Sequence, residues 1–84
     1  MSIKFRKATS RKTECYLVSI GEHTFGISYQ TVIVYWGPLG ACRRANSWGP
    51  TTGRHFSDLH ATHLPVVSDD EFQLRVDRAT GEAR

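Results

Sequence analysis

Cysteine is scarce in this sequence, because only Cys15 and Cys42 occur among 84 residues. A disulfide-stabilised domain of this size would carry more cysteines, so a reducing, cytoplasmic setting is favoured. Long hydrophobic runs are also missing: no stretch approaches the ~20 apolar residues that span a bilayer, and no signal peptide opens the chain. We therefore expect a cytoplasmic protein that makes no membrane contact.

Catalytic motifs are absent too, since the sequence contains no Walker loop, GxGxxG, HExxH or GxSxG. A reactive Cys42 beside Arg43-Arg44, paired with His55 or His60, is one alternative, but a small buried cysteine is the commoner case. A second alternative is a metal site built from His55, His60 and His63, completed by Asp58 or Cys42. Their spacing matches no known zinc motif. We expect no enzyme activity, no metal and no cofactor.

The composition, with 39% hydrophobic and 11% aromatic residues, indicates one globular domain over residues 1–84. Short β-rich segments predict an antiparallel meander of about four strands at residues 15–20, 23–29, 31–36 and 41–45. Ile3 and Phe5 begin a short strand, and residues 1–13 should form a partly mobile basic segment.

Two helices are expected after the sheet. The first begins at Pro50-Thr51-Thr52 with a threonine cap and ends before Pro65, with one face formed by Phe56, Leu59, His60 and His63. The second begins at the capping box Ser68–Glu71 and runs to about Ala79, followed by a frayed tail over residues 80–84. Phe72, Leu74 and Val76 also alternate like a strand, but the cap favours a helix. The prediction is an α+β fold with both short helices packed on one face of the sheet.

The net charge of +3 is unevenly distributed along the chain. Residues 1–54 carry eight basic and two acidic residues, whereas residues 55–84 carry three basic and six acidic ones. One interpretation is nucleic-acid binding, in which phosphates are neutralised by the N-terminal cluster Lys4, Arg6, Lys7, Arg11 and Lys12. Exposed aromatics would stack on unpaired bases, the candidates being Tyr16, Tyr35 and Trp48. The alternative is that the charges only solvate the domain and the aromatics form its core.

The tract Ser47–His55, SWGPTTGRH, is the most distinctive segment of the chain. Trp48-Gly49-Pro50 predicts a turn at the start of the first helix, from which Arg54 and His55 project. Because a helix N-terminus is electropositive, an anion or an acidic partner could bind there. The alternative is that Trp48 fills the core and the threonines only cap the helix.

A group of small phage and mobile-element proteins resembles this chain over roughly residues 16–60. Those proteins share a strand of the form SYxTxIA and a helix start of the form TTxxH. Here the matching residues are Ser28-Tyr29-Gln30-Thr31-Val32-Ile33-Val34, Arg43-Arg44-Ala45-Asn46 and Trp48-Gly49-Pro50-Thr51-Thr52-Gly53-Arg54-His55. The chain departs from the pattern at Val34, where a small residue is common, and at the bulky pair Tyr35-Trp36.

The resemblance implies a non-catalytic inhibitor of a host defence system, of the anti-CRISPR type, acting in the host cytoplasm as a monomer or homodimer. Such a protein would block the surface of a host defence protein or ribonucleoprotein complex. The residues expected to contact that partner are Arg43, Arg44, Arg54, His55, Tyr35, Asp69, Asp70 and Glu71. A small nucleic-acid-binding protein that uses the basic N-terminal half is the alternative.

Overall fold

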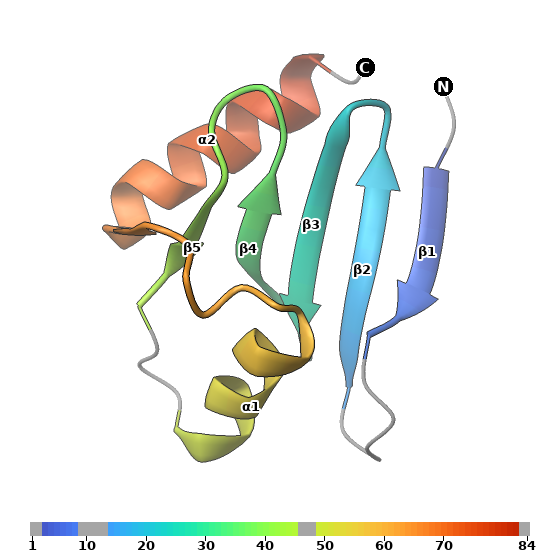
Figure 1. Cartoon of the computed structure of the whole chain (residues 1–84). Helices are drawn as coiled ribbons and strands as arrows, with labels where there is room; N and C mark the ends of the chain where they lie inside the picture. Colours follow the sequence, from blue (N-terminus) through green and yellow to red (C-terminus); the bar gives the residue numbers. More distant parts are fainter. Residues whose placement is uncertain (1–2, 9–13, 46–48, 83–84) are drawn as a thin grey trace.

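The computed structural model describes residues 3–8, 14–45 and 49–82, which form a six-stranded sheet with two helices (Figure 1). The elements follow in the order β1 Ile3–Lys7, β2 Cys15–Ile20, β3 His23–Ser28, β4 Thr31–Trp36, β5 Cys42–Arg44, α1 Pro50–Asp58, β6 Val66–Val67 and α2 Asp69–Glu82. Neighbours in sequence are neighbours in the sheet, and every pair is antiparallel except the parallel pair β5 and β6. The α+β class is confirmed, but the sheet has six strands where about four were expected.

The central strands lie where the sequence placed them. The bounds of β2 and β4 match the expected segments, and Gly21 turns between β2 and β3 with a positive φ of 60°. β3 ends at Ser28, one residue early, because Tyr29 adopts a left-handed φ of 56°. Tyr29 therefore does not share the face of Phe25, as the alternation had suggested.

The two additional strands are the outermost ones. β1 is a full strand of five residues paired along its length with β2, whereas a short start at Ile3 and Phe5 was expected. β6 has only two residues and runs parallel to β5. A parallel pair requires a crossover connection, and α1 lies within the segment that provides it.

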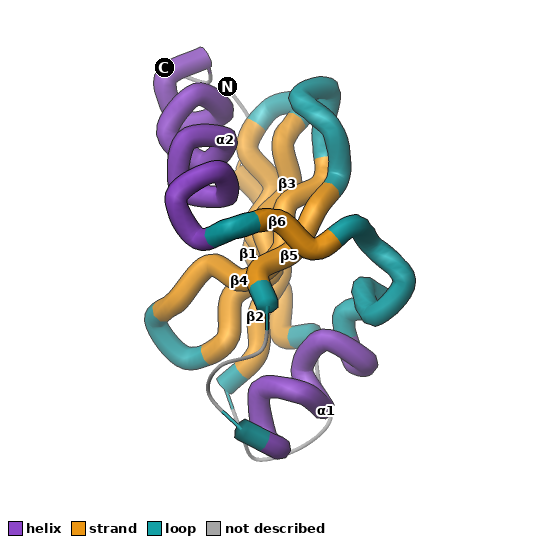
Figure 2. Tube along the Cα trace, turned by 90° about the vertical axis from the view of Figure 1, so that its left-hand side faces the viewer, coloured by secondary structure: helices purple, strands orange, loops and turns teal. Residues whose placement is uncertain are grey.

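The helices lie on opposite faces of the sheet, as Figure 2 shows. Phe56 of α1 and Leu59, the residue directly after it, belong to a cluster with Val34, whereas α2 contributes Phe72 to a second cluster with Tyr35. Adjacent residues of a strand point to opposite faces. The prediction that both helices share one face is wrong, because β4 is apolar on both sides and each side requires cover.

α1 is shorter than its sequence pattern predicted. Pro50 opens it after Gly49, and within the described residues no side chain caps its N-terminus, so the prediction of a threonine cap is wrong. The helix ends at Asp58, since His60 adopts a left-handed φ of 55° and the Ala61 N–H donates to the Phe56 carbonyl at 2.9 Å. A hydrogen bond of this kind, from the sixth residue back to the first, is that of the Schellman motif at a helix C-terminus. His60 and His63 consequently lie beyond the helix and not on its face.

The start of α2 follows the predicted capping box. The Glu71 N–H donates to Oγ of Ser68 at 3.2 Å, and Phe72 and Ala79 are buried, so the helical interpretation is confirmed. The helix continues to Glu82 instead of ending near Ala79. Over the described residues, neither helix is long and apolar enough to cross a membrane.

A substitution at Gly26 of β3 can test how closely α1 approaches the sheet. A Cβ atom at this position would lie 2.8 Å from Cδ1 of Leu59 and 3.2 Å from Cβ of Val34. We expect Gly26→Ala to lower the free energy of unfolding by about 1–2 kcal/mol in urea titrations, because Leu59 is buried and must shift.

Gly81→Ala is the matched control, because a Cβ there meets no atom within 4 Å. Alanine favours a helix over glycine by up to about 1 kcal/mol, so this variant should be equal to or more stable than the parent. A Gly26→Ala variant as stable as Gly81→Ala would contradict the close packing of α1.

Candidate nucleic-acid interface

The adjacent residues Arg43 and Arg44 of β5 point to opposite faces, and each packs on one helix. The Arg43 guanidinium lies 3.9 Å from the ring centre of Phe56 in α1, and that of Arg44 lies 4.6 Å from the ring centre of Phe72 in α2. Arg44 also donates from Nε to the Val32 carbonyl at 2.8 Å. Both arginines therefore take part in contacts that join the helices to the sheet.

Two of the three acidic residues at the start of α2 that were expected to contact a partner are paired with arginines of this chain. Asp69 accepts a hydrogen bond from Arg44 at 3.2 Å, and Glu71 pairs with Arg75 at 3.3 Å within the helix. Asp70 is exposed. Arg44 and Asp69 were both expected to contact a partner, and the structure brings these two together.

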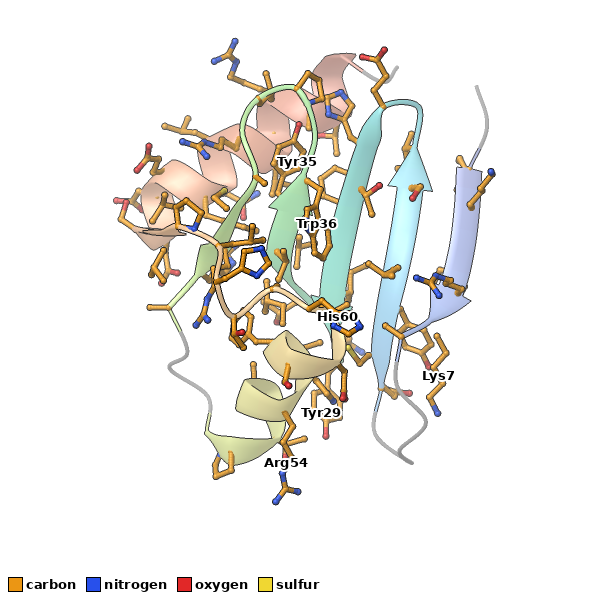
Figure 3. All side chains as sticks on the ribbon, in the orientation of Figure 1. Lys7, Tyr29, Tyr35, Trp36, Arg54 and His60 are labelled. Carbon is orange, nitrogen blue, oxygen red and sulfur yellow. The ribbon has the colours of Figure 1, made fainter. Side chains whose placement is uncertain are left out.

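Two other expected contact residues are buried. Tyr35 is 0% exposed, and its hydroxyl shares a hydrogen bond of 2.8 Å with Nδ1 of His23. His55 is also 0% exposed, which corrects the expectation that it projects from the helix start. Arg54 is exposed and points away from the sheet at the far end of α1 (Figure 3).

The motif residues that carry the phage-protein resemblance meet in space. Oγ of Ser28 lies 2.6 Å from Nδ1 of His55 and 3.4 Å from Oγ1 of Thr52, and the Tyr29 ring lies 5.6 Å from the His55 ring. Ser28, Thr52 and His55 are all buried, and Ser28 and Thr52 line a cavity of about 120 Å³. These contacts join the end of β3 to α1.

A concave surface lies beside α1, on the face of the sheet that α1 only partly covers. One part of it is a pocket of about 400 Å³ between strands β1 to β4 and the end of α1. A second hollow of about 300 Å³ continues it along β1 and β2. We call this surface the sheet groove; its principal residues are Lys4, Arg6, Leu17, Ser19, Thr24, Trp36 and His60.

Strand register aligns four of these residues in one row. Lys4 pairs with Ser19, Ser19 with Thr24, and Thr24 with Trp36, so the row crosses β1 to β4 on one face. Three interstrand spacings amount to roughly 14 Å. The row therefore has a cation at one end, hydroxyl groups in the middle and an indole at the other end.

The expected N-terminal basic cluster is divided by the same alternation. Lys4 and Arg6 lie on the face of the sheet groove, whereas Lys7 lies on the opposite face, opposite Tyr16 in register. Arg11 and Lys12 fall outside the described residues, as does Trp48. Tyr16, expected as a stacking residue, packs on Phe5 with ring centres 5.0 Å apart, away from the groove.

The end of α1 supplies the wall of the sheet groove. His60 is exposed there in a left-handed backbone conformation, which histidine adopts more readily than most residues but less readily than glycine. Figure 3 shows His60 and Trp36 on the same side of the sheet. The sequence did not identify Trp36 or Thr24 as site residues, and it named His60 only as a candidate metal ligand or partner of Cys42. The alternation of each strand, combined with the register, is the signal that would have grouped Thr24 and Trp36 with Lys4.

The histidines were candidates for a metal site and for activation of Cys42. Among residues 3–8, 14–45 and 49–82, no three His, Cys, Asp or Glu side chains are grouped so that they could hold a metal ion. Cys42 packs with Phe72 on the α2 face, and His55 and His60 lie on the α1 side. The sheet therefore separates the cysteine from both proposed partners.

Comparison of the chain with protein-family models, with curated proteins and with solved structures returns no match.

Beneath the sheet groove, burial raises the pKa of the Cys15 thiol from 9.0 to about 11, and the negative charge of Asp58 adds to the rise. Between these pH values the unfolded chain releases the Cys15 proton while the folded chain keeps it. The unfolded state then binds fewer protons, so stability falls as pH rises. We expect a loss of roughly 2 kcal/mol from pH 9 to 11 in denaturant titrations.

Cys15→Ala is the reference for this effect, because other groups titrate in the same range. The variant should show a shallower decline of stability with pH, whatever its stability at neutral pH. Parallel declines of the two proteins would contradict the raised pKa.

Proposed function

We propose that this protein binds single-stranded nucleic acid in the sheet groove. The observation that carries the proposal is the row of Lys4, Ser19, Thr24 and Trp36 across four neighbouring strands. Proteins that bind single strands combine cations that follow the backbone with aromatic rings on which bases stack. The groove supplies both on one face, with Arg6 beside the row.

The dimensions favour a single strand over a duplex. The end of the groove bordered by Trp36 and His60, about 400 Å³ in volume, has room for a planar base. In a duplex the base faces are stacked on each other and are not accessible to an indole. Hydroxyl groups in the row, where Ser19 and Thr24 lie 3.0 Å apart, can donate hydrogen bonds to phosphate or sugar oxygens.

The charge of the groove sets the expected salt dependence. Lys4 and Arg6 are exposed, whereas Asp58 and Glu22 border the ends of the surface. Two neutralised phosphates of a single strand correspond to a slope of about −1.4 for log K against log salt concentration. Binding should therefore be modest in affinity and depend on stacking as much as on charge.

Inhibition of a host defence complex, implied by the resemblance, stays a prediction. The residues expected to contact such a complex form no continuous surface: Tyr35 and His55 are buried, and Arg44 and Asp69 bind each other. Single-strand binding is the function that the geometry supports best.

Fluorescence anisotropy with labelled oligothymidylate and oligouridylate of about 15 nucleotides, and with a duplex, tests the proposal. We expect saturable binding of the single strands and weaker binding of the duplex. Trp36→Ala should weaken single-strand binding by roughly 5- to 100-fold, because stacking of one base is lost. Trp36→Phe should retain most of the affinity, since it keeps an aromatic ring.

The charge variants have a matched control within the same strand. Lys4→Ala combined with Arg6→Ala should weaken binding and bring the salt slope towards zero. Lys7→Ala removes a charge from the opposite face and should change neither. Equal losses from Lys4→Ala and Lys7→Ala, or no single-strand binding at low salt, would contradict the proposal; circular dichroism verifies that each variant folds.

A further inference from the structure

β1 is the outermost strand of the sheet, and within the described residues it pairs on one side only, with β2. All five of its residues are exposed. An unpaired edge presents backbone N–H and C=O groups that can pair with another extended chain. We propose that β1 binds, through this edge, an extended segment of another protein in which apolar and acidic residues alternate.

The face of β1 opposite the sheet groove presents two apolar side chains, Ile3 and Phe5, and ends at the cation Lys7. Ile3 and Phe5 are each 65% exposed, although they are large hydrophobic residues. Phe5 stacks on Tyr16 of β2, with ring planes 24° apart, and Val18 lies beside it in register. An added strand would place its own apolar side chains next to these and reduce their exposure to water.

α2 leaves this apolar surface uncovered. Its buried residues Phe72 and Ala79 pack with Phe25, Tyr35 and Cys42, on the strands towards the other edge of the sheet. Figure 2 shows α2 beside β5 and β6, on the side of the sheet away from α1. Ile3 and Phe5 are thus outside the core that α2 completes, which reaches towards β1 only as far as Ile20, the register partner of Ile3.

The other face of β1 selects the charge of the partner. Lys4 and Arg6 are exposed on that face, so the residues of an added strand opposite them should be acidic. Opposite charges directly across two strands stabilise the pair, and like charges destabilise it. The alternation of β1 therefore specifies a complementary alternation of apolar and acidic residues.

A second copy of the chain does not fit this edge. Antiparallel self-pairing centred on Phe5 would place Lys4 opposite Arg6 of the other copy, and parallel self-pairing in register would place each cation opposite its own equivalent. The acidic residues at the start of α2, Asp69 to Glu71, are helical and cannot supply the strand. A different protein is the occupant that the charges favour.

The test uses three labelled synthetic peptides, each of seven residues. In one, valine and glutamate alternate; in the second, valine and lysine alternate; the third has the composition of the first with all glutamates grouped together. We expect saturable binding of the valine–glutamate peptide to the full chain, at least about tenfold tighter than that of the other two. Chemical shift changes in ¹⁵N spectra should centre on β1.

Charge reversal provides the sharper comparison. Lys4→Glu combined with Arg6→Glu should switch the preference to the valine–lysine peptide, and Ile3→Thr combined with Phe5→Thr should weaken both. The threonine variant should still bind single-stranded nucleic acid, whereas Trp36→Ala should still bind the valine–glutamate peptide. Each proposal can therefore fail without the other.

Several results would overturn the inference. These are the absence of saturable binding by the valine–glutamate peptide, equal binding of the grouped peptide, or a charge-reversed variant that folds but keeps its original preference. Sedimentation velocity decides the remaining alternative, because dimerisation that the threonine variant abolishes would identify a second copy as the occupant.

Discussion

The buried hydrogen bond of 2.6 Å between Ser28 and His55 fixes α1 on the sheet, and the shape of the sheet groove depends on it. Two further contacts follow along the same helix: Phe56 lies under the Arg43 guanidinium, and Leu59 approaches the sheet at Gly26. Three anchors within five residues hold a helix of only nine residues. Because isolated helices of this length are marginal in water, tertiary contacts must maintain it. These contacts therefore also position His60, which forms the wall of the sheet groove.

The same strand alternation that builds the core also divides the functional surfaces. In β5, Arg43 and Arg44 pack on helices on opposite faces, and in β1 the cations Lys4 and Arg6 are separated from Phe5. A central strand with apolar residues on both sides needs two covering layers, and two short helices cover only part of each face. α1 leaves part of its face of β1 to β4 open, where the sheet groove lies, and no other described strand pairs with the outer edge of β1, where the second proposed surface lies.

Local signals predicted the central strands and the start of α2, because alternation and a capping box act over a few residues. β6 was missed because two residues carry no periodicity, and its pairing with β5 depends on the crossover through α1. The placement of the helices on opposite faces was missed for a related reason. Apolar residues on both sides of β4 indicate that both faces must be covered, but they do not indicate which helix covers which face. The site was only partly predicted, since grouping Lys4, Arg6 and Lys7 by charge ignored the alternation that sends Lys7 to the other face. His55, taken as exposed, is buried because Ser28, distant in sequence, completes its hydrogen bond.

Lys4 and Arg6 belong to both proposed surfaces, and this sharing has a thermodynamic consequence. An acidic strand at the edge of β1 would neutralise the cations that a phosphate backbone needs, and a bound phosphate backbone would repel the acidic strand. Coupling between two ligands is reciprocal, so each would weaken the other by the same factor. The apolar contacts of Ile3 and Phe5 lie on the opposite face and do not enter this competition. A protein partner with an acidic, extended segment would thus displace single-stranded nucleic acid without contacting Trp36. The two binding surfaces share β1 because the domain is small.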